Sequence, residues 1–498
     1  MPKPTFASAR LPLAAAAFLA AAPMAHAQAR APDIWADWQG VSGRFGGTLD
    51  AGSSDYAGGT LTLRDVTFRT EGTGARTSAD LGTITMTEQE DGSVDIALPA
   101  RFETRGTAPA DGGEIEQTTT IENEALTIVA QEDEGRRTYD IDADAMTVVM
   151  ETVAAVAEET AEPTRVTLRL DGIESEILTG LGAAGDGFEQ SYSVDGMEVV
   201  SGYAGEEGAL SFTYALTGVT SDVEGRYGEG TGGEVRSLAD LDIAYAGTVE
   251  HSGSTLEVAA ETPDGPLDIS GSAEAGTIAF DLAETSLSYS LTSTGGAVTA
   301  QLPGFPLPVD LSMREVRSAF SLPRGETGTE QPFALDLALR DLEVDDVLWS
   351  LFDPAGELPR EPATVEFDLD GTAVMDVDLF GDPAAAEALD GPPGALRSLT
   401  LNTLLVALAG AELRGSGAVT FAEGVEPPEP VGTVDLALDG GFALLDRLVA
   451  LQLITPQQAA FVKGMAGAVA ETVGEDALET TVEFLPGGAV TANGMPVK

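Results

Sequence analysis

The sequence contains no cysteine and only two histidines among its 498 residues. Without thiols the chain cannot form disulfides, thiolate zinc sites or iron–sulfur clusters, and it has no thiolate nucleophile. It also lacks the cysteine that a bacterial lipoprotein needs for acylation. One histidine, His26, lies in an N-terminal segment that we expect to be removed. His251 alone would then remain, which excludes a histidine-rich metal site but still permits one catalytic triad.

Basic residues are also scarce, with 25 Lys and Arg against 82 Asp and Glu, for a net charge of −57. A surface this acidic repels phosphate backbones, so we expect no nucleic-acid partner. The same field disfavours docking on anionic lipid head groups unless divalent cations intervene. The acidity therefore has two interpretations: adaptation to salt or solubility, and a surface that binds divalent cations weakly.

Residues 1–27 have the pattern of a secretory signal peptide. Lys3 and Arg10 precede an apolar run at 11–22, and the small residues Ala25 and Ala27 define a cleavage site before Gln28. The alternative is that the segment stays as an uncleaved N-terminal anchor. No later stretch approaches eighteen apolar residues, so no transmembrane helix is predicted in the mature chain. We therefore expect the protein to be periplasmic or secreted.

Apolar and polar residues alternate with a period of two through much of the chain, which predicts strands with one apolar and one polar face. Sheets of this kind are normally antiparallel. The clearest runs have their apolar members at Leu210, Phe212, Tyr214 and Leu216; at Ile278, Phe280 and Leu282; at Phe333, Leu335, Leu337 and Leu339; and at Leu478, Val482 and Phe484. The fold class predicted is mainly β, with extended antiparallel sheets forming a sandwich or an elongated groove.

A few short helices interrupt this pattern. They are predicted at 32–45, at 344–352 and as a pair within 441–473. The first helix of the pair is apolar almost all round and is expected to be buried. The second begins at a capping box in which Thr455 is the N-cap, Pro456 is at N1 and Gln458 is at N3. Its predicted apolar stripe consists of Val462, Ala466, Val469 and Val473.

Breaks at 228–233 and 324–331 suggest three β-rich regions after the signal peptide. Their bounds are 28–227, 234–323 and 332–498, the last containing the helical pair. A continuous elongated sheet with weak internal boundaries is equally compatible with the sequence.

A short sequence recurs at 166–172, 365–371 and 434–440. In each copy, apolar residues at every second position precede Asp-Gly, which predicts a strand closed by a tight turn. The spacing between the copies is unequal, so this is no regular solenoid. The recurrence is either a reused structural unit or chance in a biased composition.

Asp140, Asp142 and Asp144 are the metal candidates, because alternate carboxylates on one strand face can bind a hard cation such as Ca²⁺. They lack the Gly and distal Glu of an EF-hand loop, and the alternative is a solvated polar face. The sequence has no G-x-S-x-G, H-E-x-x-H or Walker A motif. G-x-G-x-x-G occurs at 180–185 and 228–233, but neither copy lies between a clear strand and a clear helix. We therefore predict no catalytic residues, binding residues or cofactor.

Several stretches of the chain resemble an uncharacterised family of exported alphaproteobacterial proteins, the domain of unknown function 2125. The stretches that carry the resemblance are 34–39, 302–306, 348–360, 410–418 and 488–494. The family supplies no activity or site residues. A looser likeness links the chain to AsmA-type envelope proteins, which have long β-rich regions and an ending similar to residues 434–494.

These observations favour an exported, non-enzymatic protein that binds or transfers a hydrophobic ligand or lipid, or binds a protein partner, in the cell envelope. Three alternatives remain open: a structural β-sandwich interaction protein without ligand, an acidic-surface hydrolase using paired carboxylates, and an outer-membrane β-barrel. Low aromatic content disfavours the last. The observation that separates the first two is whether the apolar strand faces pack on one another or stay open.

Overall fold

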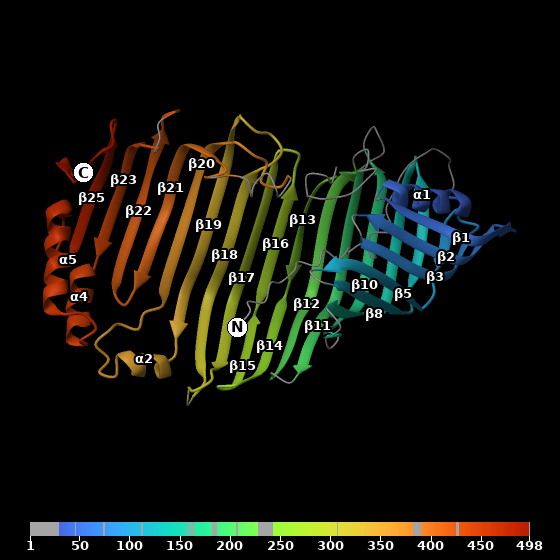
Figure 1. Cartoon of the computed structure of the whole chain (residues 1–498), viewed down its shortest axis with the longest axis horizontal. Coiled ribbons are helices and arrows are strands. Elements are labelled where there is room, and N and C mark those ends of the chain that lie inside the picture. The colour runs from blue at the N-terminus through green and yellow to red at the C-terminus, as the bar shows by residue number, and fades with distance from the viewer. Residues whose placement is uncertain are drawn as a thin grey trace. The chain divides into compact units, whose positions relative to one another are not determined.

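The alternating sequence folds into long antiparallel strands, as predicted (Figure 1). The computed structural model describes residues 29–44, 46–72, 75–110, 113–156, 159–160, 164–181, 187–205, 208–227, 243–305, 307–381, 389, 391–424 and 428–497. The predicted signal peptide, with its cleavage site at Ala27 and Gln28, lies outside these residues. The predicted break at 228–233 also lies outside them, as does most of the glycine-rich segment at 180–185.

The chain divides into two units, Met1–Asp268 and Ile269–Lys498, with the division inside one strand. We call them the N-terminal and C-terminal units. The division into three regions stays a prediction.

Among its described residues the N-terminal unit has one helix, and the described strands follow that helix in the chain. They are α1 (Ala31–Arg44), β1 (Gly47–Ala57), β2 (Thr60–Gly72), β3 (Ala75–Glu88), β4 (Val94–Ala97), β5 (Arg101–Ala110), β6 (Gly113–Glu124), β7 (Thr127–Asp133), β8 (Arg136–Val156), β9 (Glu159–Thr160), β10 (Thr164–Leu181), β11 (Gly187–Gly205), β12 (Gly208–Tyr227), β13 (Ile243–His251), β14 (Gly253–Thr262) and β15 (Gly265–Ala273), which crosses the division.

The C-terminal unit has the remaining strands and three described helices. They are β16 (Ala275–Leu282), β17 (Ser286–Gln301), β18 (Val309–Pro323), β19 (Glu330–Val344), α2 (Asp346–Phe352), β20 (Ala363–Met375), β21 (Gly394–Leu408), β22 (Ala411–Phe421), β23 (Pro430–Asp439), α4 (Gly441–Ala450), α5 (Pro456–Val469), β24 (Glu471–Thr472), β25 (Ala477–Leu485), β26 (Ala489–Ala492) and β27 (Met495–Pro496).

Most strands pair with the next one along the chain or the one after it, so each unit is built mainly as a meander of hairpins. In some places two shorter strands pair with successive parts of the same edge of one longer strand. For example, β8 pairs with β10 along one edge, while β6 and β7 share its other edge. Antiparallel pairing of sequence neighbours needs only short connections, which explains why turn residues separate the alternating runs.

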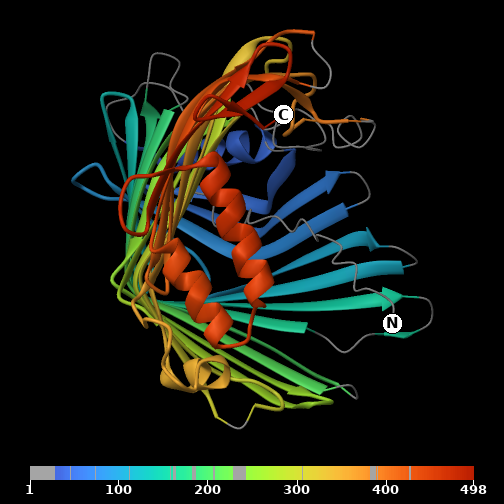
Figure 2. The same cartoon turned by 90° about the vertical axis from the view of Figure 1, so that its left-hand side faces the viewer.

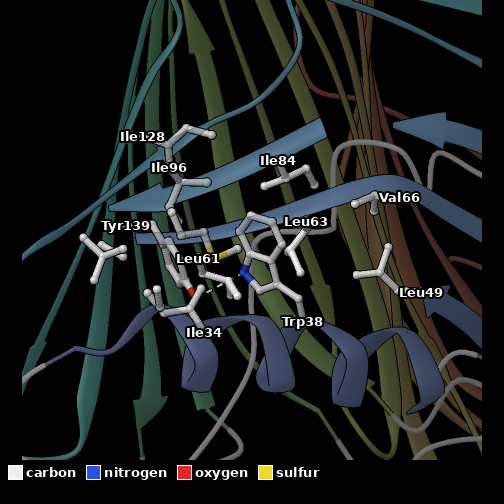
Figure 3. Packing of buried hydrophobic residues seen from close by; sticks show 14 of the residues in the cluster. Ile34, Trp38, Leu49, Leu61, Leu63, Val66, Ile84, Ile96, Ile128 and Tyr139 are labelled. Atoms are coloured by element: carbon white, nitrogen blue, oxygen red, sulfur yellow. Dashed lines mark hydrogen bonds between the residues drawn. The ribbon is translucent and has the colours of Figure 1, made fainter. Parts of the chain in front are cut away.

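The main hydrophobic core lies in the N-terminal unit, between α1 and the strands that follow it. Ile34 and Trp38 of α1 point toward Leu61 and Leu63 of β2 (Figure 3). The indole Nε1 of Trp38 donates to the hydroxyl of buried Tyr139, 3.3 Å away. A smaller buried cluster of Val194, Leu216 and Val219 lies further along the same unit.

The predicted helices are present, with one correction to their burial. Helix α1 matches the segment 32–45, α2 covers most of 344–352, and α4 and α5 form the predicted pair. The capping box at Thr455 and Gln458 is confirmed. Helix α4 is only half-buried, although its composition predicted full burial, because just one side of it packs on α5 and β22.

The Asp-Gly pairs of the recurring sequence do not form the tight turns that we predicted. Asp171-Gly172 lies in the middle of β10 and Asp370-Gly371 in the middle of β20, while Asp439-Gly440 joins β23 to α4. Gly172 has φ +62°, and a Cβ there would collide with the carboxylate of Asp195 on β11. This residue is therefore a kink inside a strand that continues on both sides.

The kinks explain how the apolar residues stay on one face along β10, which has 18 residues, and β17, which has 16. Gly172 of β10 and Gly295 of β17 both have φ +62°. At each of them, two polar or small residues, instead of one, separate consecutive residues that point to the apolar face. On β10 these inward residues are Leu170 and Ile173, both of which pack on the smaller cluster. A left-handed residue shifts the alternation by one position, which keeps the same side of the sheet apolar.

Candidate functional site

The candidate site is the apolar face of the C-terminal unit, because large apolar side chains lie in register on most of its strands. The central row follows the cross-strand register through nine strands. Its members are Phe280, Tyr289, Phe320, Leu335, Leu369, Leu401, Gly417, Val434 and Val482. All of them are half-buried. At the usual strand spacing the row extends roughly 38 Å.

Two further rows flank the central one on the same face. One contains Ile278, Leu291, Leu337, Phe367, Leu404 and Leu436, with Ser318, Gly415 and Thr480 at its register positions on β18, β22 and β25. The other contains Val316, Leu339, Val365, Val406, Leu413, Leu438 and Leu478. Leu337 is 40% exposed and Val365 is 44% exposed. In the part of the C-terminal unit that the structure describes, no second sheet packs on this face.

The opposite face of the same strands carries ion pairs. Arg340 of β19 donates through Nε and Nη2 to the carboxylate of Glu366, at 2.7 and 2.9 Å, and through Nη1 to Glu315 at 2.5 Å. Hydrogen bonding to the Arg340 guanidinium lowers the pKa of Glu366. Arg317 pairs with Asp336 beside this cluster. The prediction of one apolar and one polar face is therefore confirmed here.

Helices α4 and α5 cover the far end of the apolar face. Figure 2 shows them lying side by side in front of the last strands. Thr480, whose register partner Leu436 belongs to a flanking row, donates its hydroxyl to the carbonyl of Val469 at 2.8 Å. The carboxylate of Asp476 accepts from the backbone N–H groups of Phe442 and Ala443 at the start of α4. These contacts fix the helical pair to the final strands.

The N-terminal unit has a shorter apolar row of the same kind. Ile121, Val148, Leu168, Val199, Tyr214 and Leu256 follow the register from β6 to β14. Tyr203 and Leu210, at the ends of β11 and β12, extend this face and are nearly half exposed. The row lies apart from the core under α1, since none of its residues belongs to that cluster.

A buried ionic cluster attaches α1 to the strands. Arg137 of β8 pairs with Asp37 of α1 and with Glu132 of β7, the latter at 2.9 Å. Burial raises the pKa of Asp37, because desolvation disfavours its charged form by more than the adjacent Arg137 guanidinium favours it. Burial also raises the pKa of Tyr139, whose hydroxyl contacts Trp38. Each charged group here is used to hold the helix, so we assign the cluster a structural role.

The metal candidates Asp140, Asp142 and Asp144 lie on the outward side of β8, opposite buried Tyr139 and Ala143. Asp140 and Asp142 face Glu176 and Glu174 of β10 across the register. Among the described residues, no three His, Asp or Glu side chains come close enough to hold a metal ion. The structure therefore does not bring these three carboxylates together as ligands.

His251 ends β13, and its buried Nδ1 has no hydrogen-bond partner among the described residues. Trp349 of α2 lies under the guanidinium of Arg360, 5.9 Å from ring centroid to Cζ, so it packs against a cation within the chain. Sequence reasoning missed the ionic clusters at Arg137 and Arg340. Asp37 is 100 residues from Arg137, and Glu315 and Glu366 are 25 and 26 residues from Arg340, so no short spacing motif reveals these pairs.

No family model, curated protein or solved structure matches the chain. In the described part of the chain, no helix has both the length and the apolar composition needed to cross a bilayer.

Proposed function

We propose that the protein is an exported, non-enzymatic component of the cell envelope that binds the apolar part of a lipid or similar ligand on its open sheet faces. The observation that carries this proposal is the set of apolar rows across nine strands of the C-terminal unit. Contiguous exposed apolar surface of this extent is unfavourable in water unless a partner covers it.

The chemistry of the two faces supports an apolar ligand rather than a substrate for hydrolysis. The apolar rows offer few acid–base or nucleophilic groups: the phenol of Tyr289 and the hydroxyls of Ser318 and Thr480, the last of which donates to a backbone carbonyl. Charged groups such as Arg340 and Glu366 lie on the other face and are paired with each other. A ligand on the apolar face would thus be held by burial of hydrocarbon, which is worth about 25 cal/mol per Å².

Lipid analysis of the purified protein tests the proposal. We expect organic extraction of the protein from a periplasmic fraction to release lipid that mass spectrometry detects. Leu337→Asp and Val365→Asp place carboxylates within the apolar rows and should abolish recovery of this lipid. Ser416→Asp adds the same charge on the opposite, exposed face of β22 and should leave recovery unchanged. Equal recovery from all three variants would overturn the proposed binding face.

Export is proposed from the signal-peptide pattern of residues 1–27. Sequencing of the mature N-terminus should give Gln28 as its first residue. An intact Met1 in protein recovered from the cytosol would refute export while leaving the apolar faces available for a different ligand.

A further inference from the structure

Helix α5 is oriented with its bulky apolar side chains toward solvent. Phe461 is 67% exposed, Met465 56% and Val462 47%. Its inward side carries small residues instead, of which Ala459 is buried and Ala466 half-buried. A surface helix of a soluble protein normally shows the reverse arrangement. The predicted stripe of Val462, Ala466, Val469 and Val473 is therefore wrong at Val462 and Val473, which are exposed.

Contacts within the helical pair hold α5 in this orientation. The only charged residue of α5, Lys463, points toward α4 and donates to Asp446 at 2.7 Å, with its ammonium 5.4 Å from the ring of Phe442. The capping box fixes the start of the helix, and the carbonyl of Val469 accepts from Thr480 at its end. Rolling the helix to bury Phe461 would break these contacts.

The turn before α5 extends the exposed surface. Leu453 in this turn is 53% exposed. Together, Leu453, Phe461, Val462 and Met465 form a surface that we call the hairpin patch. Its side chains come from the turn and from successive turns of one helix, so they lie along one side of the helical pair.

Charge distinguishes the hairpin patch from the rest of the molecule. The 24 residues from Arg447 to Ala470 include no Asp or Glu, although the whole chain has 82. Arg447 and Lys463 are the charged residues in this stretch. The stretch is thus free of the carboxylates that would keep the chain away from a lipid head-group layer.

We propose that the helical pair α4–α5 docks on the surface of a lipid bilayer, with the four side chains of the hairpin patch inserted at head-group level. An apolar helix face whose neighbouring charges, Lys463 and Asp446, neutralise each other suits interfacial binding, in which the helix lies on the membrane. A second copy of the chain is a poorer occupant, because each copy has a net charge of −57 and the copies repel one another. This surface is separate from the ligand-binding face, so the two proposals can fail independently.

Vesicle binding by the full chain tests the docking. The protein should float with vesicles of phosphatidylcholine. Phe461→Ser and Met465→Ser should each weaken this binding about tenfold. Both positions are exposed, so the variants should melt like the parent. Leu351→Ser on α2, which removes a side chain 60% exposed outside the hairpin patch, should bind as the parent does.

Changes in lipid charge and in salt sharpen the test. Vesicles containing phosphatidylglycerol should bind more weakly at low salt, because the rest of the chain is acidic, and added salt should restore binding. Leu337→Asp, which blocks the sheet face, should leave flotation unchanged, and Phe461→Ser should leave the extracted lipid unchanged.

Three outcomes would overturn the proposal. The first is no flotation of the parent protein, and the second is equal flotation of the parent, Phe461→Ser and Met465→Ser. The third is concentration-dependent self-association without vesicles that Phe461→Ser abolishes, which would assign the hairpin patch to a second copy of the chain. Analytical ultracentrifugation measures this third outcome.

Discussion

In the N-terminal unit, α1 buries the apolar side chains of β2, β3 and β8, whereas in the C-terminal unit the corresponding side chains of β17 to β21 are half-exposed. Both clusters of fully buried side chains in the described chain lie in the N-terminal unit. The strands of the two units have the same alternation and the same mid-strand kinks. What differs is the covering layer, so identical strand chemistry yields a core in one place and an open surface in the other.

Truncation of one aromatic side chain in each unit should give the largest contrast. Trp38→Ala removes a buried indole and should lower the free energy of unfolding by about 3–5 kcal/mol. Phe320→Ala removes a half-exposed ring and should cost about 1–2 kcal/mol. Urea denaturation followed by circular dichroism measures both. Equal costs would mean that the C-terminal face is covered in solution.

Removal of the central cation from each ionic cluster should also separate the units. Arg137→Met leaves Asp37 and Glu132 without a shared partner in a buried position, and we expect a loss of about 3 kcal/mol. Arg340→Met acts on a better-solvated cluster and should cost about 1 kcal/mol. Urea unfolding midpoints of the two variants show which substitution causes the larger loss of stability. A larger loss for Arg340 would contradict the burial difference.

The kinks can be tested with two glycines on neighbouring strands, Gly172 of β10 and Gly196 of β11. Gly172→Ala puts a side chain at positive φ and against Asp195, and should destabilise the N-terminal unit by about 1–3 kcal/mol. Gly196→Ala, on the neighbouring strand, meets no atom within 4 Å and should change stability little. Thermal melts of the two variants compare them. A neutral Gly172→Ala would show that β10 needs no left-handed residue.

Lowering the pH should change the stability contributions of Glu366 and Asp37 in opposite directions. We expect these effects to be smaller than those of the substitutions above. The pKa of Glu366 is lowered in the folded state, so its contribution to stability is lost as the pH falls through its folded-state pKa. The pKa of Asp37 is raised, so its contribution is lost as the pH rises through its folded-state pKa. Glu366→Gln should therefore flatten the acid loss, while Asp37→Asn should gain stability relative to the parent as pH rises. Urea midpoints measured at several acidic pH values test both changes. A pH dependence opposite to the one expected for either variant would contradict the assigned direction of that pKa shift.

Strands and their apolar faces could be predicted because the alternation is visible within a short segment. In the runs Phe333 to Leu339 and Ile278 to Leu282, every second residue is apolar, and these residues lie on one face. Helix α5 could be placed from its capping box for the same reason. The kink at Gly172 could not be predicted, because an Asp-Gly pair is typical of a turn. Only the pairing of β11 with β10 on both sides of Gly172 shows that the strand continues. The exposure of Phe461 depends on which side of α5 the sheet and α4 occupy, and no periodicity in the helix contains that information.

The sequence predicted the apolar faces of the strands but not whether another layer covers them. The sequence was compatible with both a closed sandwich and an open groove, because alternation does not say whether a second layer covers the apolar residues. Sites held by distant residues, such as Arg137 with Asp37, depend on how hairpins curve toward α1. That geometry comes from the accumulated twist of many strands and has no signature in any short segment.

Pairing of most strands with one that follows closely in the chain has a consequence for how the chain acquires its structure. Every hairpin can form as soon as its second strand is available, without waiting for distant segments, so contacts accumulate from the first hairpin toward the last. A polypeptide emerging amino-end first from a narrow channel would extend its sheet one strand at a time. Only α4, α5 and the final strands, which hold one another through Asp476 and Thr480, must wait for the end of the chain to arrive.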